Sequence, residues 1–134
     1  MQPTSRSPSR AQRITGRILQ GLALLFFAFD GIAKLLMIEP VIEANRQLVF
    51  PESAIAGVGA LLLVCSILYA IPRTALIGAV LLTGYLGGAV AIQLRAGNPL
   101  FSHTLFPVYM GLIVWAALYL ADRRVRTLLA LKSA

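Results

Sequence analysis

The chain has 134 residues, of which 58% are hydrophobic and only 13% are charged, with a formal net charge of +7. A soluble domain carries about 25% charged residues, so the composition excludes the soluble globular class and predicts an integral membrane protein. The single cysteine, Cys65, excludes an intramolecular disulfide, a redox pair and a cysteine-rich metal site built from one chain.

The chain begins with a polar segment, residues 1–12, that is rich in Ser, Pro, Arg and Gln and has no apolar periodicity. We expect this segment to be a disordered, basic cytoplasmic tail. Four apolar runs follow, each long enough to cross the ~30 Å hydrocarbon core of a bilayer, which takes about 20 helical residues. These runs cover residues 18–38, 54–71, 74–94 and 104–121.

The four runs show no strand-like alternation, and Leu, Ala, Met and Gly dominate them. Helices therefore satisfy the backbone hydrogen bonds in lipid. The predicted fold is an all-α integral membrane bundle of four antiparallel transmembrane helices over residues 13–126, followed by a short cytoplasmic tail over residues 127–134. The first run is interpreted as a retained span, because it is longer than the apolar part of a signal peptide and contains two charges.

The basic residues are concentrated on one side of this predicted bundle. Most of the twelve Lys and Arg residues precede the first run, join the second run to the third, or follow the fourth. The positive-inside rule then places both termini in the cytoplasm. We interpret the basic segments as orientation signals and contacts to anionic lipid of the bilayer, and we expect no binding of nucleic acid.

Two further features bear on the loops and on how the helices meet. The first outer loop, residues 39–53, has room for a short helix at the membrane surface. Small residues at helical spacing, Ala56 with Ala60 and Gly84 with Gly88, allow two helix backbones to approach closely. We interpret both pairs as packing contacts within the bundle, with homodimerisation as the alternative.

The first run contains two charged residues, Asp30 and Lys34, at a depth where charges are costly. Residues four apart on a helix have side chains within contact range, so the spacing predicts an ion pair. Lys34 lies near the outer end of the run and can extend toward the interface. Asp30 lies near the midpoint, and we expect its carboxylate to point into the bundle.

Other polar side chains fall at a similar depth or farther out. Together with Asp30 and Lys34 they form a predicted outer-side pocket, whose other members are Tyr85, Gln93, Arg95, His103 and Tyr109. Such a pocket offers a carboxylate, an imidazole and phenols for proton exchange or for hydrogen bonding a quinone-like carbonyl. The alternative is that the charged pair is structural and that the other residues anchor the bundle at the outer interface.

No catalytic constellation is visible in the sequence. One His and one Cys cannot supply the ligands of a closed zinc or haem site, and the chain has neither a P-loop nor a dinucleotide-binding GxGxxG motif. We therefore expect no metal and no built-in cofactor, so that any cofactor is borrowed or lipid-soluble. Whether the protein is an enzyme stays open.

Two segments carry a resemblance to a known family. The run RILQGLALLFFAFDGIAKLL (17–36) and the late block GYLGGAVAIQLRAGNPLFSHTLFPVYMGLIVWAALYL (84–120) are similar to the DoxX-like family of small four-helix membrane proteins. The resemblance implies a multi-pass protein of the bacterial inner membrane. It also implies relatives among the subunits of thiosulfate:quinone oxidoreductase and of membrane complexes that handle thiol stress. The residues that match the family are Gly31, Lys34, His103 and Pro107.

These observations leave three functions open. The first is that of a small subunit or partner in quinone-linked or thiol redox chemistry, with a bound quinone and a membrane or soluble redox partner. The second is that of a non-catalytic scaffold or assembly subunit, in which Asp30 and Lys34 fix the helix register. The third is that of an oligomeric carrier of a small solute or of protons.

Overall fold

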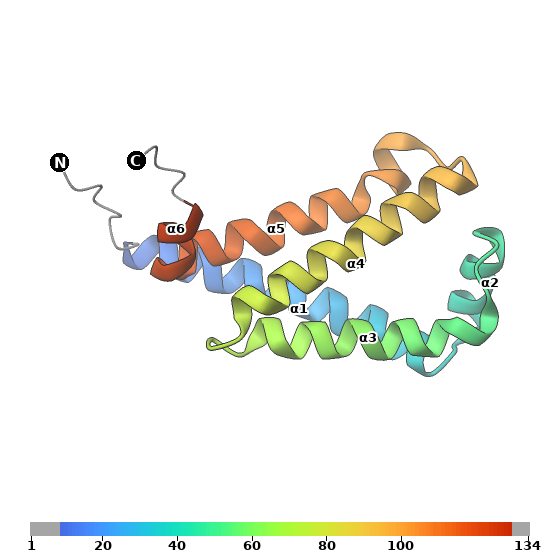
Figure 1. Ribbon diagram of the computed structural model, residues 1–134, viewed down its shortest axis with the longest axis horizontal. Helices are drawn as coiled ribbons and strands as arrows, with labels where there is room; N and C mark the ends of the chain where they lie inside the picture. The colour runs from blue at the N-terminus through green and yellow to red at the C-terminus, as the bar shows by residue number, and fades with distance from the viewer. Residues whose placement is uncertain (1–8, 130–134) are drawn as a thin grey trace.

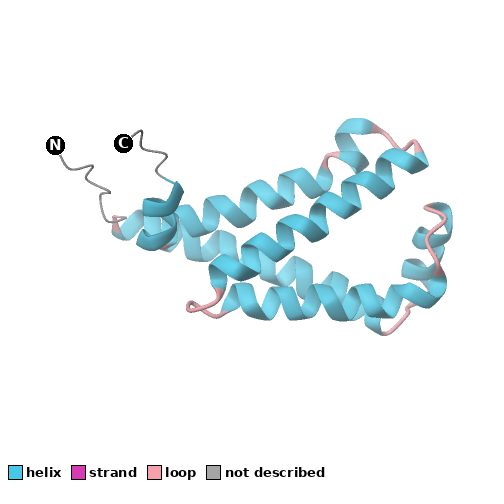
Figure 2. Cartoon of the chain, in the orientation of Figure 1, coloured by secondary structure: helices cyan, strands magenta, loops and turns pink. Residues whose placement is uncertain are grey.

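The computed structural model describes residues 9–129, which form a bundle of helices (Figure 1). No strand occurs within this range, as Figure 2 shows. The elements are α1 (Arg10–Leu35), α2 (Glu39–Gln47), α3 (Glu52–Ala70), α4 (Ala75–Ala96), the π-helical segment η1 (Leu100–Thr104), α5 (Phe106–Ala121) and α6 (Arg123–Leu129). Four segments, namely α1, α3, α4 and η1 joined to α5, are long and apolar enough to cross a membrane. The predicted all-α bundle of four spans is confirmed.

Local signals in the sequence set the ends of the helices. α1 begins after Ser9, whose hydroxyl accepts the Gln12 N–H at 3.1 Å while the Gln12 side chain accepts the Ser9 N–H at 3.0 Å, forming a capping box. α4 ends at Gly97, whose φ of 73° is the left-handed conformation that commonly follows a helix. Thr74 closes the tight turn between α3 and α4, because its hydroxyl donates to the Leu68 carbonyl at 2.7 Å.

The helices reach farther toward both termini than the sequence indicates. α1 begins at Arg10, inside the segment 1–12 that was expected to be disordered, because the capping box pairs backbone N–H groups of the first turn. α6 extends to Leu129, within the predicted tail 127–134. The rest of both predicted tails, residues 1–8 and 130–134, lies outside the described range.

The four long helices form a ring in which each contacts two neighbours. α1 packs on α3 and α5, and α4 packs on the same two helices, so that α1 and α4 lie diagonally across the bundle. Consecutive spans run antiparallel (Figure 1). The start of α1 and the helix α6 lie at the same end, where the Arg126 guanidinium donates to the Gln12 side chain at 3.3 Å. Which side of the membrane this end faces stays a prediction.

Glycines set the closest contacts between neighbouring helices. A Cβ on Gly16 of α1 would lie 2.7 Å from a carbonyl oxygen of α5, and a Cβ on Gly59 of α3 would lie 2.7 Å from the Gly31 carbonyl oxygen of α1. Gly78 of α4 packs in the same way on the backbone of α3. These positions require a residue without a side chain, because any Cβ would push the helices apart.

Gly84 and Gly88, which were singled out in the sequence, do not make contacts of this kind. Among the described residues, nothing within 4 Å would meet a Cβ on Gly84 or Gly88, and both glycines are exposed. Ala60 is exposed as well, and Ala56 is half-buried. The packing within the bundle expected of Gly84 and Gly88 is therefore wrong, because their face of α4 lines a cavity. Homodimerisation through them stays a prediction.

The buried core lies toward the end at which α3 and α4 are joined. Phe27, Leu62 and Tyr69 are almost fully buried there. The Tyr69 hydroxyl donates to the Val114 carbonyl at 2.9 Å, and the Tyr69 carbonyl accepts from the buried Gln20 amide at 3.0 Å. Toward the other end α3 and α4 diverge, and α2 lies across the opening (Figure 1). α2 is the short helix expected in the first loop, and none of its residues is buried.

Candidate functional site

Lys34 makes two polar contacts near the end of α1. Its Nζ lies 2.8 Å from Asp30 Oδ2, one turn earlier on the same helix, and donates a hydrogen bond of 2.9 Å to the Tyr85 hydroxyl on α4. The same Nζ is 5.6 Å from the centre of the Tyr85 ring, within the range of a cation–π interaction. The predicted ion pair is confirmed, and Tyr85 extends it to a second helix.

The two charged side chains are only partly buried. The exposed fraction of the side chain is 19% for Lys34 and 33% for Asp30. Residues four apart on a helix are rotated by about 40°, so the orientation that directs Lys34 toward α4 leaves the carboxylate to one side. Asp30 therefore balances the charge of Lys34 from a partly exposed position on α1. The sequence had led us to expect the Asp30 carboxylate to point into the bundle.

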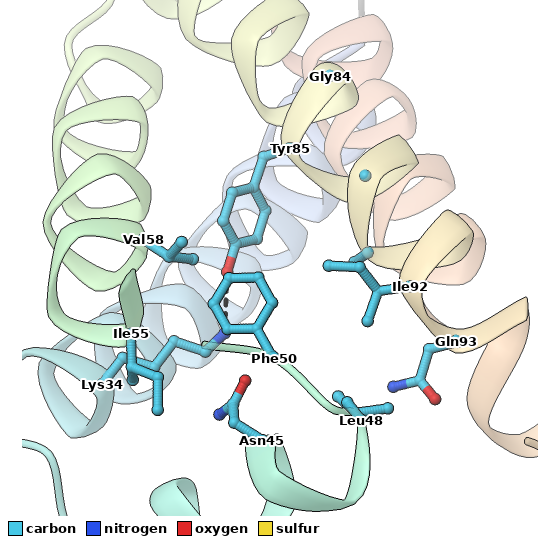
Figure 3. Close-up of a pocket in the computed structure, with 12 residues that line it drawn as sticks. Lys34, Asn45, Leu48, Phe50, Ile55, Val58, Gly84, Tyr85, Ile92 and Gln93 are labelled. Atoms are coloured by element: carbon cyan, nitrogen blue, oxygen red, sulfur yellow. Dashed lines mark hydrogen bonds between the residues drawn. The ribbon is translucent and has the colours of Figure 1, made fainter. Parts of the chain in front are cut away.

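A cavity of about 290 Å³ lies beside Lys34 and Tyr85, between α1, α3, α4 and the segment around α2 (Figure 3). Its volume is near the lower end of the range for small-molecule sites, which is roughly 300–1,000 Å³. Apolar side chains form most of the wall, namely Leu48, Phe50, Ile55, Val58 and Ile92. The α4 wall includes three small residues, Gly84, Gly88 and Ala89. This wall is hollow because the small residues leave space that larger side chains would fill.

Polar side chains face the cavity at two levels (Figure 3). At the inner level the Tyr85 oxygen accepts the hydrogen bond from Lys34, which leaves the hydroxyl proton of Tyr85 available for donation. At the outer level Asn45 donates to a backbone carbonyl of α2 at 2.8 Å, so that its Oδ1 remains an acceptor. Gln93 accepts a hydrogen bond from Asn98, so that its Nε2 remains a donor. The cavity can thus hold an apolar ring and donate hydrogen bonds to a carbonyl oxygen at its inner level.

The segment that includes α2 covers the cavity and is held there by Arg95. The Arg95 guanidinium donates to the carbonyl oxygens of Leu48 and Val49, at 3.2 Å and 3.3 Å. Met37 and Val49, which flank α2, have positive φ angles of 53° and 55°, unusual for residues with side chains. A few polar contacts therefore hold this cover, and a strained residue flanks α2 on either side. None of the residues of α2 is buried.

Two residues of the predicted pocket lie outside it. His103 is exposed on η1, where its Nδ1 lies 2.8 Å from the Ser102 hydroxyl. Tyr109 is exposed on α5, and its hydroxyl donates to the Phe101 carbonyl at 3.1 Å. Both residues lie at the η1 and α5 corner of the bundle and do not line the cavity. The expectation that they join the pocket is wrong.

Of the seven residues predicted, the structure brings Lys34, Tyr85 and Gln93 into the cavity wall and places Arg95 at the cover. Asp30 is not part of the wall and contacts it only through its ion pair with Lys34. Sequence reasoning missed the other wall residues, namely Ile55 and Val58 of α3, Ala89 and Ile92 of α4, and Asn45, Leu48 and Phe50 of the loop. The loop residues belong to the segment 39–53, where we expected a short helix at the membrane surface. Among residues 9–129 no group of His, Cys, Asp and Glu side chains has the geometry of a metal site.

Comparison with known proteins bears on both the fold and the cavity. No curated protein and no solved structure matches the chain. Residues 18–117 match the model of the DoxX-like family. This range includes every residue of the cavity wall and most of the four spans. Because the match covers well over half of the chain, the protein belongs to the DoxX-like family.

Proposed function

We propose that this protein is a multi-pass subunit or partner of a quinone-linked or thiol redox system in the bacterial inner membrane, and that its cavity binds a quinone-like ligand. The observation that carries the proposal is the hydrogen bond between Lys34 and Tyr85 at the inner level of an apolar cavity. A cation and a hydroxyl placed there match the oxygen of a quinone, while the apolar wall matches its ring.

The chemistry of reduction supports this choice of ligand. A quinone that accepts electrons develops negative charge on its carbonyl oxygens before it takes up protons. The Lys34 ammonium and the Tyr85 hydroxyl are donors fixed in advance by their contacts to each other and to Asp30, so they stabilise that charge without reorganising. The electrons come from a membrane or soluble redox partner. In this proposal the chain supplies the binding site and the hydrogen bonds.

The same contacts support a second candidate function, that of a non-catalytic scaffold. Lys34 joins Asp30 of α1 to Tyr85 of α4, two helices that are diagonal in the bundle. A polar contact of this kind fixes the register of helices that apolar packing alone specifies weakly. In the scaffold the cavity is a consequence of the helix arrangement and holds no specific ligand.

The experiment is the quinone content of the gently purified protein, measured by solvent extraction and chromatography. Tyr85→Phe removes one hydroxyl and keeps the ring, and Tyr109→Phe is the matched control because Tyr109 is exposed outside the cavity. We expect near-stoichiometric quinone in the wild type and in Tyr109→Phe, and its loss in Tyr85→Phe. Absence of quinone from all three samples contradicts the proposal and favours the scaffold.

A further inference from the structure

An open, shallow basic surface on one face of the first turns of α1, which we call the groove, lies at the end of the bundle opposite the cavity. Arg10, Arg13 and Arg17 line it, together with Ile14 and Ile18. The three arginines follow helical spacing and so share one face. The two isoleucines between them are 50% and 58% exposed. The groove thus presents guanidinium groups and apolar side chains together.

The length of α1 places this groove at the level of lipid headgroups. Its 26 residues span about 39 Å at 1.5 Å per residue, which exceeds the ~30 Å hydrocarbon core by about 9 Å. The apolar run begins near Ile18, so the excess length carries Arg10 to Arg17 out of the core. Phosphate groups of the bilayer occupy this level.

One arginine of the groove is held in place by the core. Arg17 Nη1 donates to Gln20 Oε1 at 2.7 Å, and Gln20 is only 4% exposed. The Gln20 amide in turn donates to the Tyr69 carbonyl at 3.0 Å, so its position is fixed by α3. The guanidinium of Arg17 is therefore preorganised, which reduces the entropy lost when it binds an anion.

The charge at this end of the bundle favours an anion. Of the five acidic residues in the sequence, Asp122 alone lies at this end, and it contacts Arg124 at 3.5 Å. Within residues 9–129, neither Arg10 nor Arg13 has a carboxylate within salt-bridge distance. Two of the three groove arginines are therefore free of acidic neighbours in the described part of the chain.

From this arrangement we infer that the groove binds an anionic phospholipid, with the phosphate of the headgroup on Arg10, Arg13 and Arg17 and the start of an acyl chain on Ile14 and Ile18. Arginine is suited to phosphate because its planar fork donates two hydrogen bonds at once. The exposed isoleucines distinguish a lipid from a soluble phosphate, which would gain nothing from apolar neighbours. This site is independent of the function proposed for the cavity.

The test measures binding of short-chain phosphatidylglycerol to the full-length protein in a neutral detergent. Phosphatidylcholine of the same chain length is the zwitterionic control, and inorganic phosphate is the headgroup-only competitor. We expect tight binding of phosphatidylglycerol, weak binding of phosphatidylcholine, and no displacement by millimolar phosphate. Equal binding of the two lipids, or full displacement by phosphate, would overturn the inference.

Charge-matched variants separate the groove from general attraction to a basic surface. Arg10→Gln with Arg13→Gln removes two charges from the groove, and each charge near the surface contributes about fivefold to affinity. Arg73→Gln with Arg123→Gln removes two exposed charges outside the groove and is the control. We expect a loss of about 25-fold in the first variant and a loss several times smaller in the control. Equal losses contradict a specific site.

A third variant tests the apolar part of the site. Ile14→Ser with Ile18→Ser leaves the charge unchanged and alters two exposed side chains, so the fold is retained. We expect weaker binding of phosphatidylglycerol with retained thermal stability. Unchanged affinity in this variant contradicts the acyl-chain contact and with it the assignment to a lipid.

Discussion

Lys34 of α1 and Tyr85 of α4 are joined by a hydrogen bond of 2.9 Å, although their helices lie diagonally across the bundle and share few other contacts. The bond closes the inner level of the cavity and places a cation beside a phenol within the membrane. Asp30 balances the charge from the side. Lys34 thus links two helices of the bundle and also lines the cavity.

The first prediction concerns this charge balance. Asp30→Asn and Lys34→Met should each lower the free energy of unfolding by about 2 kcal/mol, between the values for exposed and buried pairs, because each leaves a charge without its partner in a low-dielectric environment. The double variant should recover most of that loss. Thermal unfolding in detergent measures all three variants. Additive losses in the double variant would show that the two side chains are not energetically coupled.

The second prediction contrasts two classes of glycine. Gly84→Ala and Gly88→Ala should leave the thermal stability unchanged or raise it by about 0.5–1 kcal/mol each, because glycine weakens a helix and the added methyl meets no neighbour. Gly59→Ala should lower stability, since its Cβ would lie 2.7 Å from the backbone of α1. Parallel melting curves compare them. A loss at Gly88 comparable with that at Gly59 would indicate a packing contact there, as in a homodimer.

A larger side chain at the same position tests the cavity itself. Gly88→Leu extends into the cavity without meeting any described atom at its Cβ. We expect the variant to fold and to lose bound quinone, because the side chain occupies the space of the ring. Extraction of quinone from wild type and variant, beside their melting temperatures, measures both effects. Full quinone content in a folded Gly88→Leu would place the ligand elsewhere.

A further prediction addresses the cover over the cavity. Arg95→Met removes the donor to the carbonyl oxygens of Leu48 and Val49, so α2 should exchange its amide hydrogens faster. Arg46→Met is the control, because the ion pairs of Arg46 are exposed and long, at 3.7 Å and 3.9 Å. Hydrogen exchange measured by mass spectrometry reports on both. Equal exchange in α2 for the wild type and Arg95→Met would mean that Arg95 does not hold the cover.

The orientation of the bundle is tested by a reporter that is active only in the cytoplasm. Fused after Ala134, it should be active, because the basic residues at the start of α1, between α3 and α4, and in α6 favour the cytoplasmic side. A fusion in the loop between α4 and α5 is the control and should be inactive. The reverse pattern would invert the bundle and place the cavity on the cytoplasmic side.

Depth in the membrane was predictable from the sequence, whereas the direction of a side chain around its helix was less so. The position along an apolar run gives depth directly, which is why Lys34, Tyr85 and Gln93 were chosen correctly for the cavity at one end of the bundle. His103 and Tyr109 were predicted at a similar depth but lie outside the cavity, on η1 and α5. Their direction depends on helix packing and on the π-helical turn of η1, which no local pattern in the sequence specifies.

The loop shows a second limit of sequence reasoning. A short helix at the membrane surface was expected within residues 39–53, and α2 is present there. The apolar residues at its end were assigned to the membrane surface, yet Leu48 and Phe50 line the cavity. An amphipathic pattern indicates that one face is covered, but it does not distinguish lipid from protein as the covering partner. The same ambiguity explains why Gly84 and Gly88 were assigned to helix packing. Their spacing fits a helix contact as well as it fits the wall of a cavity.

The angle between α3 and α4 at their tight turn determines how far apart the two helices lie at the cavity. Gly78 holds α4 against the backbone of α3 near this turn, while the two helices diverge toward Gln93. Gln93 lies fifteen positions after Gly78 on the same helix, a distance of about 22 Å, so each degree of rotation at the turn moves the far end by about 0.4 Å. A tilt of about five degrees therefore changes the aperture by about 2 Å. The turn at one end of the bundle thus sets the width of the cavity at the other end.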